Sequence, residues 1–88
     1  MTNAQEWLDN NYPLNGTCQR KKNDGDNHWD YGKIREQITE LDISGENLIG
    51  LLNLNHFVNL TELHCFDNQL TNLDLSSCSN LSILDCSN

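Results

Sequence analysis

The 88-residue sequence predicts a small solenoid, of α/β type or mainly β, in which short parallel strands follow an N-terminal cap. Two observations predict it. Residues 60–65, LTELHC, return as LSILDC at 81–86, and ITELDI at 38–43 is an earlier copy. Residues 52–60 match residues 73–81 across the same interval of 21 positions. A fixed period in the low twenties, with apolar residues spaced L-x-x-L-x-L, is typical of repeats that each form one turn of a solenoid.

The cap is predicted to begin with a short amphipathic helix over residues 1–12. Thr2 or Asn3 can cap its N-terminus by accepting a backbone hydrogen bond. The helix should end before Pro13, because the residue that precedes a proline avoids the α conformation.

The rest of the cap, residues 14–33, has the dense charge and glycine-containing turns of a polar loop. Trp29 and Tyr31 are expected to anchor this loop on the open end of the solenoid. Terminal repeats need such a cover, since their outer side would otherwise expose apolar side chains. Residues 1–37 are therefore interpreted as the N-terminal cap.

Residues 38–88 are interpreted as the repeats, divided into units 38–59 and 60–80 and a partial unit 81–88. Each unit should contribute one short strand that alternates inward apolar with outward polar residues and pairs with its neighbour in parallel. These strands are predicted at 39–43, 61–65 and 82–86. A second L-x-L pair in each unit, Leu52/Leu54 and Leu73/Leu75, is expected to form the opposite wall in an extended conformation.

The pattern Leu60-x-x-Leu63-x-Cys65-x-x-Asn68-x-Leu70 resembles the leucine-rich-repeat consensus, in its short class of 21–22 residues, with cysteine in the third apolar slot. The resemblance covers residues 38–88. It implies a horseshoe used for protein–protein interaction, in which the turn asparagine binds buried backbone groups. In the first unit Glu46 occupies that slot, and Asn47 follows it. Because the last unit is partial, we expect a longer array, with further repeats or self-association at the C-terminal edge.

The net charge is −8, and all five Lys and Arg residues lie between positions 20 and 35. From position 36 onward there are only acids, so the repeats should repel the phosphates of nucleic acid. The basic stretch is interrupted by acids, which disfavours membrane docking. A basic or neutral protein partner is the better match. Without a signal peptide or a transmembrane segment in the sequence, the expected location is cytoplasmic, with reduced thiols.

Cys65 and Cys86 occupy equivalent inward slots and are interpreted as core residues rather than as a redox pair or half of a metal site. Cys78 is also a repeat position, whereas Cys18 is the one thiol that could be exposed. Zinc-like cysteine spacing is absent from the sequence. The alternation Asp24, Asp26, His28 and Asp30 lacks the glycine and the glutamate of a calcium loop. We therefore expect no metal, no cofactor and no catalytic residue.

The outward positions of the strands are predicted to stack in columns on a concave face. The columns are Glu40/Glu62/Ile83, Asp42/His64/Asp85 and Ser44/Phe66/Ser87. Phe66 and Ile83 resemble the apolar anchors of interfaces, and His64 between aspartates should favour its charged form. The predicted function is a non-catalytic module that binds a polypeptide on this face. The alternative is a structural spacer of a larger signalling protein with its catalytic domain beyond residue 88.

Overall fold

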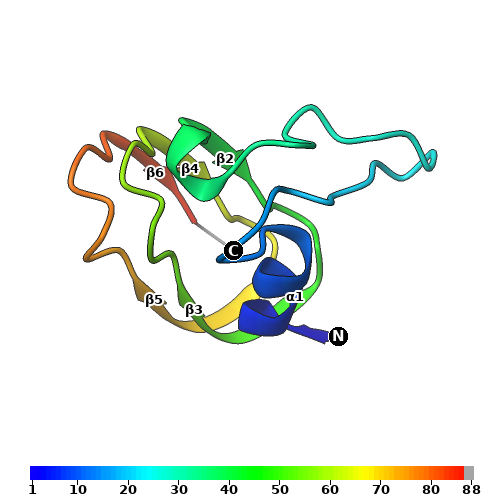
Figure 1. The fold of residues 1–88 in the computed structure, drawn as a ribbon. Helices are drawn as coiled ribbons and strands as arrows, with labels where there is room; N and C mark the ends of the chain where they lie inside the picture. Colours follow the sequence, from blue (N-terminus) through cyan, green and yellow to red (C-terminus); the bar gives the residue numbers. More distant parts are fainter. Residues whose placement is uncertain (87–88) are drawn as a thin grey trace.

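The structure is a computed structural model that describes residues 1–86, so residues 87 and 88 of the partial unit lie outside the described residues. It is a small mixed α/β fold, in which the described chain has one α-helix and two three-stranded parallel sheets (Figure 1). No helix in residues 1–86 combines the length and the apolar character required to cross a membrane.

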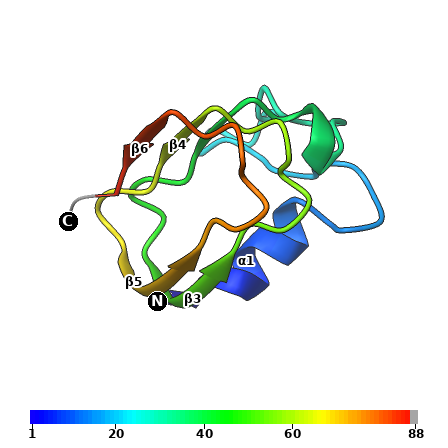
Figure 2. The same cartoon turned by 90° about the vertical axis from the view of Figure 1, so that its left-hand side faces the viewer.

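The chain passes from one sheet to the other with every strand, so that neighbours within a sheet are two strands apart in sequence (Figure 2). The first sheet has the order β2 (Glu40–Asp42), β4 (Glu62–His64) and β6 (Ile83–Asp85). The second has the order β1 (Thr2–Asn3), β3 (Leu48–Asn53) and β5 (Gln69–Asp74). All pairings in these two sheets are parallel.

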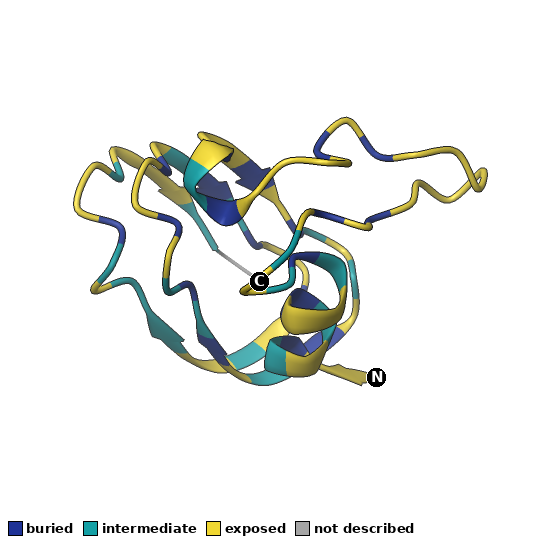
Figure 3. Ribbon diagram, in the orientation of Figure 1, coloured by how far each residue is buried: buried dark blue, intermediate teal, exposed yellow. Residues whose placement is uncertain are grey.

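Strands β2, β4 and β6 lie where the repeat copies predict them. Leu41, Leu63 and Leu84 are aligned in register, and the first two are fully buried. Figure 3 shows buried residues along the body of the fold, whereas the loop that projects from it is mostly exposed. Leu84 belongs to the edge strand and remains half-exposed. Strands β2 and β4 therefore each contribute one leucine inward and two polar residues outward.

The opposite wall is also extended, as the second L-x-L pair predicts. Leu52, Leu54 and Phe57 are fully buried in the same core. The turns between the walls use left-handed backbone at matching places. Gly45 after β2 has φ 69° and Asp67 after β4 has φ 63°, a conformation that glycine and aspartate tolerate better than most residues.

Helix α1 (Ala4–Asn11) begins as predicted, with the side-chain oxygen of Asn3 accepting the N–H of Glu6 at 3.0 Å. Ala4 and Leu8 are buried in the core, and the helix packs on β3. The side chain of Gln5 reinforces this contact by accepting the N–H of Asn53 at 2.7 Å. The pairing of β1 with β3 was not predicted, because a two-residue strand leaves no periodic signal.

The loop of residues 14–33 projects from the body, as Figure 1 shows, but its predicted anchors are wrong. Trp29 is 67% exposed and Tyr31 is 42% exposed. The base of the loop is held by Tyr12, whose hydroxyl donates to Asp30 at 2.6 Å and accepts from Arg20 at 3.0 Å. Burial and the bond to Asp30 raise the pKa of Tyr12 far above its ordinary value.

A buried arginine closes the cap over the repeats. Arg35 lies in a single 3-10 turn (Arg35–Gln37) and is 2% exposed. Its guanidinium donates to the carbonyl of Tyr12 at 2.7 Å and to the carbonyl of Asn55 at 3.0 Å, and it lies over the ring of Phe57. One side chain thus joins the end of helix α1 to the turn after β3.

Candidate protein-binding face

The register of the first sheet places the predicted site residues side by side. Glu40 is aligned with Glu62 and Ile83, and Asp42 is aligned with His64 and Asp85. These six residues and Phe66, which follows β4, are called the strand face below. Of the third predicted column, Ser44 is half-buried, Phe66 is exposed, and Ser87 lies outside the described residues.

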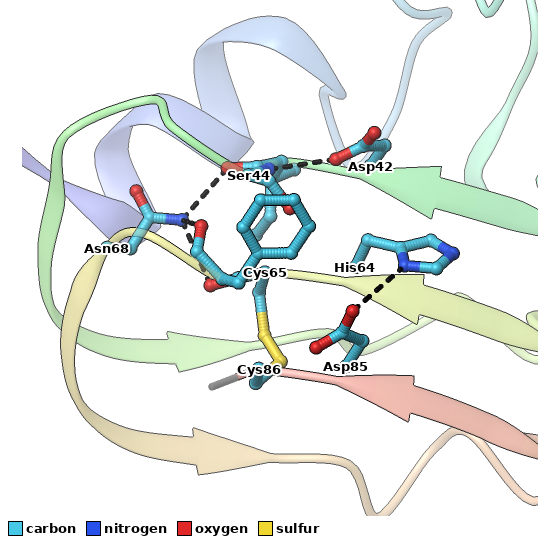
Figure 4. The surroundings of a disulfide bond; sticks show 9 residues. Asp42, Ser44, His64, Cys65, Asn68, Asp85 and Cys86 are labelled. Atoms are coloured by element: carbon cyan, nitrogen blue, oxygen red, sulfur yellow. Dashed lines mark hydrogen bonds and ion pairs between the residues drawn. A yellow bond between two sulfur atoms is a disulfide. The ribbon is translucent and has the colours of Figure 1, made fainter. Parts of the chain in front are cut away.

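Three side chains of the strand face converge on one point. The potential ligand atoms of Glu40, Glu62 and His64 all lie within 4.8 Å of one another. His64 Nε2 is 2.6 Å from Glu62 Oε2, and His64 Nδ1 is 3.9 Å from Asp85 Oδ2, the contact drawn in Figure 4. A single cation, whether a metal ion or the charged end of a Lys or Arg side chain, could contact both carboxylates, and could contact His64 only when its ring is neutral. Sequence reasoning identified the residues but not their convergence, which depends on side-chain rotamers.

The acidic surroundings act on His64. The hydrogen bond with Glu62 raises the pKa of His64, and the charges of Glu62, Asp42 and Asp85 raise it further. The sequence predicted the direction of this effect but attributed it to the two aspartates. Since the pKa is raised on folding, this interaction stabilises the fold in full below the unfolded pKa of histidine. The stabilisation is lost as pH rises through the raised folded pKa.

Two apolar side chains lie on the strand face beside the charges. Phe66 is 41% exposed and Ile83 is 49% exposed. The backbone at Phe66 is fixed, because its carbonyl accepts the N–H of Gly45 at 3.1 Å. An aromatic side chain has only two rotatable bonds and loses little conformational entropy on binding, which is why such residues are frequent anchors of interfaces.

A disulfide lies directly behind the strand face. Cys65 and Cys86 are bonded to each other, with a Cα–Cα distance of 4.5 Å (Figure 4). Cys65 lies in the core as predicted and Cys86 packs against it, but the expectation that both thiols are reduced was wrong. Equivalent positions just after neighbouring parallel strands bring the two Cα atoms within the range that a disulfide spans. The repeat predicted two buried cysteines but did not show that they are close enough to bond. Cys18 is also buried, against the expectation that it could be exposed.

We expect thiol titration of the unreduced protein with Ellman's reagent to detect no reactive thiol in the native state and two after denaturation. Cys18 and Cys78 are the two unpaired cysteines, and burial raises the pKa of both thiols, which lowers the reactive thiolate fraction. Reduction before denaturation should reveal four thiols. Four thiols without reduction would contradict the disulfide.

Comparisons of this chain with protein-family models, with curated proteins and with solved structures gave no match. Function must therefore be inferred from the side chains that the fold assembles. The strand face brings together all seven residues that the sequence nominated for binding: Glu40, Asp42, Glu62, His64, Phe66, Ile83 and Asp85.

Proposed function

We propose that this chain is a non-catalytic leucine-rich-repeat module that binds a polypeptide through its strand face. The solenoid interpretation is supported by the register of the first sheet, in which Glu40, Glu62 and Ile83 are aligned at intervals of 22 and 21 residues. It is also supported by the regular alternation of the chain between two parallel sheets. Stacked repeats of this kind offer an extended surface for protein partners.

The convergence of Glu40, Glu62 and His64 is the observation that carries the proposed function. The carboxylates would accept hydrogen bonds from a Lys or Arg side chain of the partner. Phe66 and Ile83 would contact an apolar side chain beside it. The surrounding aspartates would steer a basic segment toward the face, so affinity should fall as the salt concentration rises.

The test selects binding peptides from a random displayed library against the full 88-residue chain. We expect the selected peptides to combine a basic residue with a neighbouring apolar residue. Their affinity should fall about tenfold or more in each of F66A and E62Q, because each change removes an anchor worth at least about 1.4 kcal/mol.

Matched controls exist elsewhere on the chain. Val58 is 42% exposed, like Phe66, but lies outside the strand face, and Glu36 is a glutamate that lies 3.6 Å from a histidine, His56, also outside this face. V58A and E36Q should leave peptide affinity within about twofold of the wild type. Peptides that bind F66A and E62Q as well as the wild type, with circular dichroism unchanged, would refute the proposed function.

A further inference from the structure

A second candidate site lies among the basic residues of the chain, where the projecting loop meets helix α1. A pocket of about 210 Å³ opens there, between Trp7 of the helix and the loop residues Arg20, Lys21, Lys22, His28 and Trp29. It is separate from the strand face, none of whose seven residues lines it. We propose that this pocket binds a tetrahedral oxyanion, a phosphate or sulfate group.

Charge is the first argument. Three of the five basic residues of an otherwise acidic chain line this pocket. The one acid in its lining is Glu46, whose carboxylate is 3.5 Å from Arg20 Nη2. The lining therefore carries a net charge of +2, which matches a doubly charged phosphate or sulfate better than a carboxylate. In a chain of net charge −8, an anion would find its favourable potential here.

The second argument is an unsatisfied hydrogen-bond donor. His28 is 5% exposed, and its Nδ1 accepts the N–H of Asp30 at 3.1 Å. Since Nδ1 is an acceptor, the proton of the neutral ring must lie on Nε2. Burial lowers the pKa of His28, which keeps the ring in this neutral form. Yet Nε2 is buried with no hydrogen-bond partner among the described residues. Because His28 lines the pocket, a small shift of the side chains that cover Nε2 would let an oxyanion accept its proton.

The third argument is that the cations are available and well placed. The ammonium group of Lys22 has no hydrogen-bond or ion-pair partner within residues 1–86. The guanidinium of Arg20 is held 5.0 Å above the ring of Trp7 and by the hydroxyl of Tyr12, so its position is fixed before any ligand arrives. A fixed arginine and an exposed lysine are donors suited to a tetrahedral oxyanion, and the His28 N–H becomes a third donor when the side chains over it shift.

The pocket carries its own reporter, because the only two tryptophans of the chain, Trp7 and Trp29, both line it. Inorganic phosphate, sulfate and chloride are titrated at constant ionic strength while tryptophan fluorescence is recorded, and isothermal calorimetry repeats the titration. We expect a saturable response to phosphate, to sulfate or to both, and only a linear response to chloride. Phosphate and sulfate are thereby distinguished as the preferred group.

K22Q should weaken oxyanion affinity about tenfold, as expected for the loss of one charge-assisted hydrogen bond. K33Q is the matched control, because Lys33 belongs to the same basic segment but does not line the pocket. The oxyanion affinity of K33Q should stay within about twofold of the wild type. The proposal is overturned if neither fluorescence nor calorimetry shows saturation. It is equally overturned if K33Q weakens binding as much as K22Q, since the effect would then be one of general charge.

Discussion

Replacing Arg35 by alanine should lower the free energy of unfolding by about 3–5 kcal/mol, because the change leaves buried acceptors unpaired and opens a cavity. The carbonyls of Tyr12 and Asn55 each lose a donor at 2.7 and 3.0 Å, and the ring of Phe57 loses the guanidinium that covers it. Urea denaturation followed by circular dichroism measures the effect, with an unchanged m-value as evidence of two-state unfolding.

Two further variants at this position separate the causes. R35M keeps most of the packing volume and removes the hydrogen-bond donors. R35K keeps the charge but replaces the planar guanidinium, with its several N–H groups, by a single ammonium group. Both should lose about 2 kcal/mol, and they keep the experiment readable if R35A does not fold. D9N is the control, because the carboxylate of Asp9 accepts from Arg35 at 2.8 Å but is 45% exposed, so its loss should cost under about 1 kcal/mol. A cost below about 1 kcal/mol for R35A would refute the structural role.

The importance of Arg35 could not be predicted from the sequence. A charged residue next to a repeat is expected to be exposed, and its burial depends on two carbonyls that meet only when the cap is docked. The same reason explains why Trp29 and Tyr31 were wrongly predicted as anchors. Aromatic content alone does not show which side of a loop faces the core, and the hydrogen-bonding partners of Tyr12 lie 8 and 18 residues away.

The repeat, by contrast, was sufficient to predict the first sheet. Copies at intervals of 22 and 21 residues determine which positions align, so the columns headed by Glu40 and Asp42 follow from spacing alone. Spacing does not determine rotamers, so the closest partner of His64 was missed. The spacing also did not reveal that the alignment of Cys65 with Cys86 allows a disulfide, because both cysteines had already been interpreted as core residues.

The resemblance to leucine-rich repeats implies that the turn asparagine, Asn68, binds buried backbone groups. Asn68 is 8% exposed, and its Oδ1 accepts the N–H of Leu48 at 2.9 Å. Its Nδ2 donates to the carbonyls of Ile43 at 2.9 Å and Cys65 at 3.2 Å, while a third carbonyl, of Phe66, lies at 3.4 Å. An amide has only two N–H groups, so the third contact must share a proton. Asn68 therefore joins two successive turns through their buried backbone groups.

N68A should cost about 3 kcal/mol of unfolding free energy, since the carbonyl of Ile43 and the N–H of Leu48 are left without partners. N68D preserves the acceptor for Leu48 but directs oxygen against carbonyl oxygen. It should be at least as destabilising at about pH 7 and less so at about pH 4, where protonation restores a donor. Urea denaturation at both pH values measures this difference.

The control for these variants is N72A, because Asn72 is exposed on β5, and its loss should stay within about 0.5 kcal/mol. The first turn gives an internal comparison. Its equivalent slot holds Glu46, which pairs with Arg20 at 3.5 Å, and E46A should therefore cost much less than N68A. If N68A and E46A were equally mild, Asn68 would not be the structural link between the two turns.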